Sequence, residues 1–252
     1  MLEAKDIQKC YMDRTGRSCE AVCGVTFTLP ERKIYALVGE SGCGKSTLSR
    51  ILTGLEPPTG GQVLLDGHPL SRRGKTNRLK TCAAVQLVLQ DGKSAMDPRF
   101  SVYQTIAEPM RYLLYMTKEQ EHLRVFELLK RLELPSETAQ KKAGELSGGQ
   151  QKRVCIARAL AASPRYIIFD EAISGLDVVL RKTILELLLK IQKEEQCGYL
   201  FITHEVEAAL YLSNSILVMQ NGVIVEQCEW NGGIHCFKHS YTKQLLQAAR
   251  LI

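Results

Sequence analysis

Short apolar runs alternate with polar, helix-rich segments along the chain. Three runs rich in branched or aromatic residues have the length of buried parallel strands, and they lie at 34–38, 166–169 and 199–203. Small, polar or charged residues follow each run, which is where open α/β sheets bind their ligands. A fourth run, 85–89, alternates enough to be a strand with one wetter face. The pattern therefore predicts an α/β fold with a parallel sheet.

Helical periodicity covers 102–132 and 178–193, where apolar residues recur on one face. The stretch 91–164 is rich in helix formers and poor in strand signals, which predicts a helical insertion between strands. The residues before 34 and the segment 61–65 have a β-like pattern and are expected to be antiparallel.

The segment 215–226 predicts a hairpin. Asn221-Gly222 lies between its two apolar halves, and this dipeptide supplies the positive φ angles that a tight primed turn requires.

The chain has 252 residues, of which 45% are hydrophobic and 24% are charged. This length predicts one large domain or a domain with a subdomain, stable without a disulfide or metal. The net charge of +6 is mild and gives no reason to expect a nucleic-acid partner. Nine cysteines without a CxxC pair favour a reducing compartment. The polar N-terminus argues against a signal peptide, and the apolar runs are too short for a membrane span.

A phosphate-binding loop follows the first apolar run. The residues that fit G-x-x-x-x-G-K-[ST] are Gly39, Glu40, Ser41, Gly42, Cys43, Gly44, Lys45 and Ser46. Glycines let backbone N–H groups turn toward phosphate oxygens, and the helix that follows adds its positive end. Lys45 is expected to reach the β- and γ-phosphates, and the Ser46 hydroxyl to bind Mg²⁺. A glycine-rich turn that matches by chance is the alternative, and the strand–loop–helix context disfavours it.

Two carboxylates, Asp170 and Glu171, close the apolar run 166–169. Beside a phosphate-binding loop, this pattern predicts that Asp170 holds Mg²⁺ and that Glu171 activates or orients the attacking water. The alternative is an ordinary acidic exit from a strand.

The sequence Leu146-Ser147-Gly148-Gly149-Gln150 opens a helical run shortly before Asp170. LSGGQ between a phosphate-binding loop and an Asp-Glu pair resembles the signature of ATP-binding cassette (ABC) ATPases. The other motifs of the family follow in order: Gln90 resembles the Q-loop glutamine, Ser174-Gly175-Leu176-Asp177 the D-loop, His204 the switch histidine and Tyr11 the ring that stacks on adenine.

The resemblance covers the whole chain and implies a P-loop NTPase (RecA-like) core with an N-terminal antiparallel β-subdomain and an inserted helical subdomain. A single domain is expected over 1–252, with the core and β-subdomain at 1–90 and 165–227. The helical signature subdomain is expected at 91–164 and a short tail at 228–252.

The resemblance also implies ATP and Mg²⁺ as ligands and assigns roles to residues. The catalytic residues would be Lys45, Gln90, Glu171 and His204, and the metal ligands Ser46, Gln90 and Asp170. The nucleotide-binding residues would be Tyr11, the loop 39–46, Thr47, Ser147, Gly148, Gly149, Gln150 and Asp177. In the family, two cassettes pair head to tail, so each LSGGQ caps the ATP on the partner's phosphate-binding loop.

A narrower resemblance concerns the importers of oligopeptides, dipeptides, nickel and metal chelates. It rests on Asp97-Pro98-Arg99 after the Q-loop and on His239-Ser240-Tyr241-Thr242 in the tail, which match the NPR-like and HPYT patterns imperfectly. It implies a second cassette (a paralogue or a second copy), two membrane-spanning permease subunits and, indirectly, an extracytoplasmic solute-binding protein. The expected location is the cytoplasmic face of the cell membrane, with peripheral attachment.

Other interpretations remain open. A soluble ABC ATPase acting on ribosomes or nucleic acid usually joins two cassettes or inserts coiled coils, and a regulatory cassette would lack intact catalytic residues. The tail residues Cys228, His235, Cys236 and His239 suggest a metal site, but a variable tail is favoured because no structure between them fixes tetrahedral geometry. Cys43, next to a helix N-terminus, is expected to have a lowered pKa, with redox control as an alternative to a tolerated small side chain. The basic run 72–80 is expected to be a solvated loop.

Overall fold

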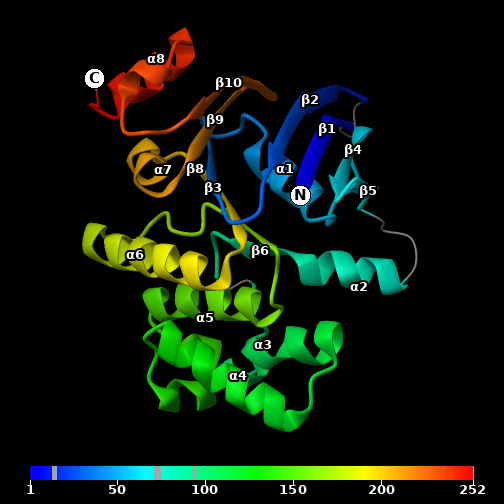
Figure 1. Cartoon of the computed structure of the whole chain (residues 1–252), viewed down its shortest axis with the longest axis vertical. Coiled ribbons are helices and arrows are strands. Elements are labelled where there is room, and N and C mark those ends of the chain that lie inside the picture. Colours follow the sequence, from blue (N-terminus) through cyan, green and yellow to red (C-terminus); the bar gives the residue numbers. More distant parts are fainter. Residues whose placement is uncertain (13–15, 71–74, 93–94, 252) are drawn as a thin grey trace. The chain divides into compact units, whose positions relative to one another are not determined.

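A computed structural model describes residues 1–12, 16–70, 75–92 and 95–251. The chain divides into two compact units (Figure 1). Unit 1 comprises Met1–Arg78 and Gly198–Ile252, and unit 2 comprises Leu79–Cys197. Helix α2 (Lys75–Ala84) contains the boundary.

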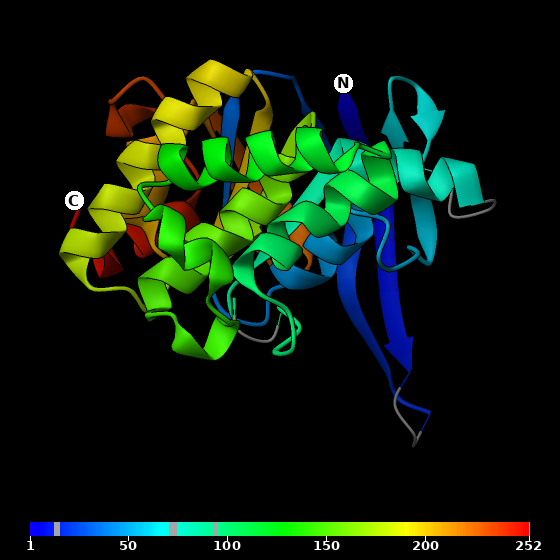
Figure 2. The same cartoon turned by 90° about the horizontal axis from the view of Figure 1, so that it is seen from below.

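Unit 1 contains a four-stranded antiparallel sheet near the N-terminus. Its strands are β1 (Leu2–Met12), β2 (Ser18–Leu29), β4 (Gly60–Leu65) and β5 (His68–Pro69), in the order β2-β1-β4-β5. The long β1 and β2 run side by side in Figure 2, with apolar side chains of β1 such as Leu2 and Ile7 fully buried. The antiparallel pairing predicted for this region is confirmed.

Unit 1 also contains parallel strands. Strand β3 (Ile34–Val38) pairs in parallel with both β8 (Gly198–Thr203) and β9 (Ser215–Gln220), and all five of its residues are buried. Strand β10 (Val223–Glu229) returns antiparallel to β9 through Asn221 (φ 47°) and Gly222 (φ 81°). The predicted hairpin is therefore confirmed, with the expected turn chemistry.

The helices of unit 1 follow its strands. They are α1 (Lys45–Leu52), α7 (Val206–Leu212), a 3₁₀ turn η4 (Ile234–Cys236) and α8 (Ser240–Ala248). Helix α1 directly follows the glycine-rich loop after β3, so the strand–loop–helix context expected for phosphate binding is present.

Unit 2 combines a parallel strand pair with helices. Strands β6 (Val85–Leu89) and β7 (Tyr166–Asp170) pair in register from Val85↔Tyr166 to Leu89↔Asp170. The helical elements are α3 (Val102–Pro109), η1 (Met110–Leu114), α4 (Lys118–Arg131), η2 (Ser136–Gln140), η3 (Ala143–Glu145), α5 (Gly148–Ala161) and α6 (Val178–Glu195). Helices α3 and α4 both pack on α5 (Figure 2).

The structure confirms one local prediction with a break and corrects another. The stretch 102–132 is helical as predicted, but Tyr115 (φ 53°) ends its first part and Thr117 caps a new helix with a capping box. The basic run 72–80 is not all loop, because α2 begins at Lys75; residues 72–74 lie outside those the structure describes. The side chains of Thr76 to Arg78 are nevertheless exposed, as expected for a solvated segment.

The glycine-rich loop packs closely against backbone from two other parts of unit 1. A Cβ at Gly39 would lie 2.2 Å from the carbonyl oxygen of Met219 in β9, and one at Gly44 (φ 106°) would lie 2.0 Å from that of Ala21 in β2. The N–H of Gly222 also donates to the carbonyl of Cys43 at 3.0 Å. The loop is thus tied to its neighbours through backbone that leaves no room for a side chain.

We expect Gly39→Ala to lower the free energy of unfolding by about 3 kcal/mol, because the methyl group must displace backbone rather than a flexible side chain. Gly144→Ala is the control, since a Cβ there meets nothing within 4 Å. Denaturant unfolding of both variants checks this, and equal midpoints for the two would contradict the close approach at Gly39.

A charge network joins α4 to the end of α6 within unit 2. Glu195 accepts hydrogen bonds from Arg131 and from Arg124 (3.0 Å), and Arg131 also reaches Glu194 at 2.8 Å. Burial raises the pKa of the Glu195 carboxyl, but the hydrogen bonds from Arg131 and Arg124 outweigh it, so the pKa lies below its usual value of 4.5. Because the folded pKa is lowered, the stabilisation is present above pH 4.5 and is lost as the pH falls through the lowered pKa.

Glu195→Gln should lower the free energy of unfolding by about 1–3 kcal/mol at pH 7, because two partly buried arginines lose their charged partner. It should also flatten the pH dependence of stability below pH 4.5. Glu186→Gln on the same helix is the matched control, since its pair with Lys182 is exposed and 3.9 Å long. Urea unfolding between pH 3 and 7 measures both effects. An equal loss in the free energy of unfolding in the two variants would show that the Glu195 network does not stabilise the fold more than an exposed ion pair.

Candidate functional site

The phosphate-binding loop of unit 1 closes around its own lysine. Lys45, the first residue of α1, is 4% exposed, and its ammonium group donates to the carbonyls of Gly39 (2.8 Å) and Glu40 (2.7 Å). Gly42 and Gly44 both have positive φ, which lets the backbone turn sharply before the helix. A buried ammonium at the N-terminus of a helix, ringed by loop backbone, is suited to binding an anion such as phosphate.

The remaining loop residues differ in exposure. Ser41 and Ser46 are exposed, whereas Thr47 is buried. The Ser46 hydroxyl stands at the second position of α1, where a ligand at the helix N-terminus can reach it.

Cys43 does not have the lowered pKa expected from its sequence position. Burial raises the pKa of its thiol, although Lys45, whose ammonium group lies 3.8 Å from the sulfur, pulls it down. A buried thiol with a raised pKa is a poor nucleophile. The structure therefore favours a small packing side chain over the redox-control alternative.

Tyr11, near the end of β1, is fixed by polar contacts at its hydroxyl, and the Lys9 ammonium group lies over its ring, 5.1 Å from the centroid. Tyr11 is 36% exposed, and its hydroxyl donates to Glu56 at 2.9 Å and lies 3.5 Å from the Thr47 hydroxyl. Glu56 also pairs with Lys9 (2.8 Å) and Arg50 (3.2 Å). Burial raises the pKa of the Glu56 carboxyl, but hydrogen bonds from Lys9, Tyr11 and Arg50 bring it below its usual value. The ring is thus anchored at its hydroxyl end, as a stacking platform requires.

His204 follows strand β8 directly, as predicted, and its side chain is exposed. It stands at the carboxyl end of a strand that is parallel to β3, the strand that leads into the phosphate-binding loop. Residues at the carboxyl ends of neighbouring parallel strands lie at the same edge of the sheet.

Three predicted site residues of unit 2 lie at one end of its strand pair. Gln90 follows β6 and is exposed, and its carbonyl accepts a hydrogen bond from Lys152. Asp170 ends β7 and is 6% exposed, and Glu171 comes next in a left-handed conformation (φ 49°). Since Leu89 and Asp170 are register partners, Gln90 and Glu171 continue from neighbouring strand ends. The carbonyl of Glu171 accepts the Ser174 hydroxyl at 2.7 Å, which fixes the turn into the D-loop sequence.

The signature sequence forms the N-terminus of α5. Ser147 is the N-cap: its hydroxyl accepts the N–H of Gln150, and the Gln150 side chain accepts the N–H of Ser147, which completes a capping box. Ser147 and Gly148 are exposed, whereas Gly149 is buried, and a Cβ there would lie 2.8 Å from Leu180. The start of this 14-residue helix is therefore rigid and open on one side, which suits an anion that approaches from outside.

Asp177 has a structural role that the sequence did not indicate. Its carboxylate accepts the N–H of Leu180 at 2.9 Å and caps α6. The next two residues, Val178 and Val179, are 76% and 77% exposed, so an apolar patch lies beside this cap.

Three of the four tail residues considered as a metal site have other partners. Cys228 and Cys236 form a disulfide, a bond that the cysteine spacing did not indicate, and His239 accepts the N–H of Tyr241 as the cap of α8. In the described part of the chain, nowhere do three or more His, Cys, Asp or Glu side chains gather to hold a metal ion. The metal interpretation of the tail therefore has no support.

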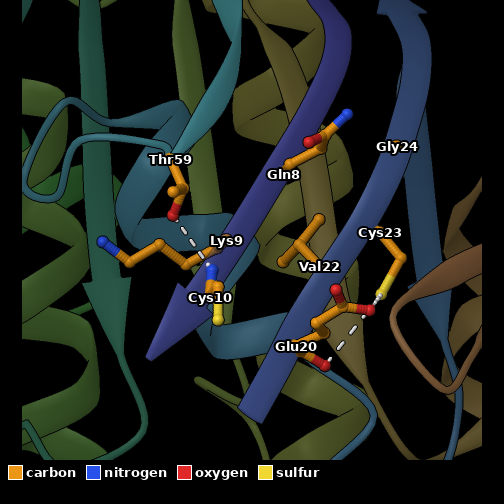
Figure 3. A pocket seen from close by; sticks show the side chains of 8 residues that line it. All are labelled: Gln8, Lys9, Cys10, Glu20, Val22, Cys23, Gly24 and Thr59. Atoms are coloured by element: carbon orange, nitrogen blue, oxygen red, sulfur yellow. Dashed lines mark hydrogen bonds between the residues drawn. The ribbon is translucent and has the colours of Figure 1, made fainter. Parts of the chain in front are cut away.

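A pocket of about 300 Å³ lies on the sheet formed by β1 and β2, and the sequence did not predict it (Figure 3). Cys10, Glu20 and Cys23 line it, with Lys9 and Thr59 at one side. Burial raises the pKa of the Cys23 thiol, and the neighbouring Glu20 carboxylate raises it further. The thiol therefore stays protonated at neutral pH, which disfavours metal binding or nucleophilic chemistry in this pocket.

Comparison with known proteins identifies relatives over most of the chain. A family model described as ABC transporter matches residues 22–174, more than half of the chain. The nickel import ATP-binding protein NikE of Brucella abortus (strain 2308) is 38% identical over 98% of this chain and 94% of its own length. NikE of Escherichia coli (strain K12) is 43% identical over 80% of this chain and 75% of its own length.

Solved structures agree with these relatives. The ATP-binding cassette MJ0796, described as a dimer in a post-hydrolysis state bound to ADP and Pi, has a TM-score of 0.81 and 28% identity, covering 92% of this chain and 100% of its own. The cbiO1 protein of Clostridium perfringens, described as part of the ABC transporter complex cbiONQ, has a TM-score of 0.77 and 27% identity, covering 90% of this chain and 87% of its own.

These similarities confirm the fold class predicted from the sequence and its assignment as an ATP-hydrolysing cassette of the importer branch. The glycine-rich loop around Lys45 and the capped LSGGQ helix both lie within residues 22–174, which the family model matches. The chain is therefore an ATPase that belongs to the ABC transporter family.

Proposed function

We propose that this chain is the energy-coupling subunit of a membrane importer for nickel, metal chelates or peptides, attached peripherally at the cytoplasmic face of the membrane. One observation carries the proposal: the phosphate-binding loop is already wrapped around Lys45 at the start of α1, so the triphosphate site is preformed. The similarity to nickel import ATP-binding proteins along nearly the whole chain supports the importer role. Among the described residues, every helix falls short of the length and apolarity needed to cross a bilayer.

In the proposed mechanism, the adenine of ATP stacks on Tyr11, and the triphosphate lies on the backbone of residues 39–47. Lys45 exchanges its loop carbonyl partners for the β- and γ-phosphates, which are stronger acceptors because they are charged. Glu171 accepts a proton from, or orients, the attacking water, and His204 stabilises the charge that spreads over the γ-phosphate.

The side chains expected to hold Mg²⁺ are chemically suited to it. Ser46 offers a hydroxyl, Gln90 an amide oxygen and Asp170 a carboxylate, and Mg²⁺ prefers a few oxygen ligands from protein together with phosphate and water. When bound, Mg²⁺ would neutralise charge on the β- and γ-phosphates.

We also propose that two cassettes pair head to tail. The exposed start of α5, with Ser147 and Gly148 presented to solvent, would cap ATP bound to a partner's phosphate-binding loop. Val178 and Val179, exposed beside the Asp177 cap, would be covered by the same partner. The other partners would be two permease subunits and, through them, a solute-binding protein. The names of the similar nickel import proteins favour nickel as the transported solute.

Lys45→Ala should weaken MgATP binding by at least about 100-fold, because the loss of a buried charge-assisted phosphate contact removes about 3 kcal/mol. Calorimetric titration of the purified chain measures the affinity. Lys190→Ala on α6, outside the motifs, should bind MgATP like the unaltered chain. Unchanged affinity in the Lys45 variant would rule out phosphate binding at this loop.

Glu171→Gln should keep MgATP binding but reduce ATP turnover by about 100-fold or more, because the amide cannot accept the proton of the attacking water. It should also accumulate as an ATP-bound pair in size-exclusion chromatography, since the closed state is no longer consumed. Turnover near that of the unaltered chain would reject Glu171 as the general base, while leaving the nucleotide site itself intact.

A further inference from the structure

The C-terminal tail of unit 1 touches the phosphate-binding loop. Tyr241, in the first turn of α8, is 5% exposed, and its hydroxyl accepts the backbone N–H of Glu40 at 3.1 Å. The carbonyl of the same residue, Glu40, accepts the ammonium group of Lys45 at 2.7 Å. The backbone N–H of Glu40 is therefore bound by the tail, and its backbone carbonyl is bound by the lysine of the loop.

Three further contacts determine where Tyr241 lies. The Glu226 carboxylate in β10 accepts the N–H groups of Lys238 (2.6 Å) and His239 (3.0 Å), just before α8. The rings of Trp230 and Phe237 stack with centroids 5.7 Å apart. These contacts fix the chain between β10 and α8, which lie in the orange and red part of the ribbon (Figure 1).

The third contact is covalent. The disulfide between Cys228 and Cys236, which are eight positions apart in the sequence, joins the end of β10 to the 3₁₀ turn before α8. In a reducing compartment disulfides are rare, and those that form are usually transient or redox-sensing. We therefore expect that a cell could open this bond.

We propose that Tyr241 is a positioning residue for the phosphate-binding loop and that the Cys228–Cys236 disulfide holds it in place, which makes nucleotide affinity depend on the redox state of the tail. This inference rests on the proposed nucleotide site. When Lys45 leaves the Glu40 carbonyl for phosphate, that carbonyl keeps a long hydrogen bond from the Cys43 N–H (3.4 Å) within the loop, and the Tyr241 hydroxyl is the contact from outside the loop that still orients Glu40. Without that contact, ordering the loop costs conformational entropy at the moment of binding, and affinity falls.

The redox step is a two-electron exchange. A dithiol reductant supplies two electrons and two protons and leaves as its own disulfide, while the Sγ–Sγ bond breaks and Cys228 and Cys236 become thiols. The opened loop keeps its Glu226 and ring contacts, so we expect α8 to loosen rather than to detach.

The first test compares Tyr241→Phe with the unaltered chain by calorimetric titration with MgATP under oxidising conditions. The variant keeps the ring and loses only the hydroxyl, so the Kd should rise about 2- to 10-fold, the range for one hydrogen bond. Because the hydrogen bond exists without nucleotide, the midpoint of unfolding should also fall by about 2–4 °C. The rise in Kd is the deciding readout, since a purely structural role would lower the midpoint and leave the Kd unchanged. Tyr211→Phe, at an exposed tyrosine on α7, is the matched control and should bind like the unaltered chain.

The second test adds a dithiol. Reduction should raise the Kd of the unaltered chain for MgATP, by up to the factor of about 2 to 10 expected for Tyr241→Phe. It should have no effect on Tyr241→Phe or on the double variant Cys228→Ser/Cys236→Ser, whose Kd should already be raised. Cys19→Ser, at an exposed free cysteine, should respond to the dithiol like the unaltered chain.

The outcomes separate this inference from the proposed function. If the unaltered chain binds MgATP and Tyr241→Phe binds equally well, the positioning role is refuted and the nucleotide site stands. If Tyr241→Phe weakens binding but the dithiol changes nothing in the unaltered chain, the disulfide has no part in it. If the unaltered chain binds no MgATP, the proposed function fails together with the inference.

Discussion

The structure of the proposed nucleotide site depends on the close approach of one glycine-rich loop to neighbouring backbone. Gly39 and Gly44 pass within contact of the Met219 and Ala21 carbonyls, so the loop is fixed by backbone on both sides before any ligand is present. Lys45 then folds back onto the Gly39 and Glu40 carbonyls. A site that is already ordered loses little entropy on binding, so more of the phosphate contact energy appears as affinity.

In unit 2, side chains close in sequence fix the starts of three helices. Ser101, Thr117 and Ser147 each begin a helix with a capping box completed by a glutamine three residues later. Each box satisfies two backbone N–H groups that would otherwise lack partners. At Ser147 this fixes where the signature helix starts. The Ser147 and Gln150 side chains, both within the motif, thus set the direction in which the N-terminus of α5 points.

Local patterns explain which parts of the fold could be predicted. Strand β3 coincides with the expected run because five consecutive apolar residues leave few other ways to be buried, and β6 coincides with the run whose alternation predicted a strand with one wetter face. The turn at Asn221 and Gly222 follows from residues that tolerate positive φ. The helical character of 102–132 follows from its periodicity, whereas the break inside it follows from the capping pair Thr117 and Gln120, which periodicity alone does not indicate.

Features that depend on contacts far apart in the chain could not be predicted. The pKa of Cys43 is set by burial under the loop rather than by its place beside a helix, so a local argument gave the wrong direction. The disulfide depends on the path of the tail after β10, which the spacing of Cys228 and Cys236 does not determine. The role of Glu171 follows from an acidic pair beside a phosphate-binding loop and that of His204 from resemblance, and both remain predictions.

Two tyrosine hydroxyls from opposite ends of the sequence contact the two flanks of the phosphate-binding segment. Tyr241 accepts the N–H of Glu40 at its beginning, and Tyr11 lies 3.5 Å from the Thr47 hydroxyl at its end. The motif itself supplies only the glycines and the lysine, which any chain with this pattern shares. What distinguishes one such loop from another is therefore the set of distant side chains that fix its ends. In this chain those side chains come from β1 and α8, so two elements far apart in the sequence contact the two ends of this loop.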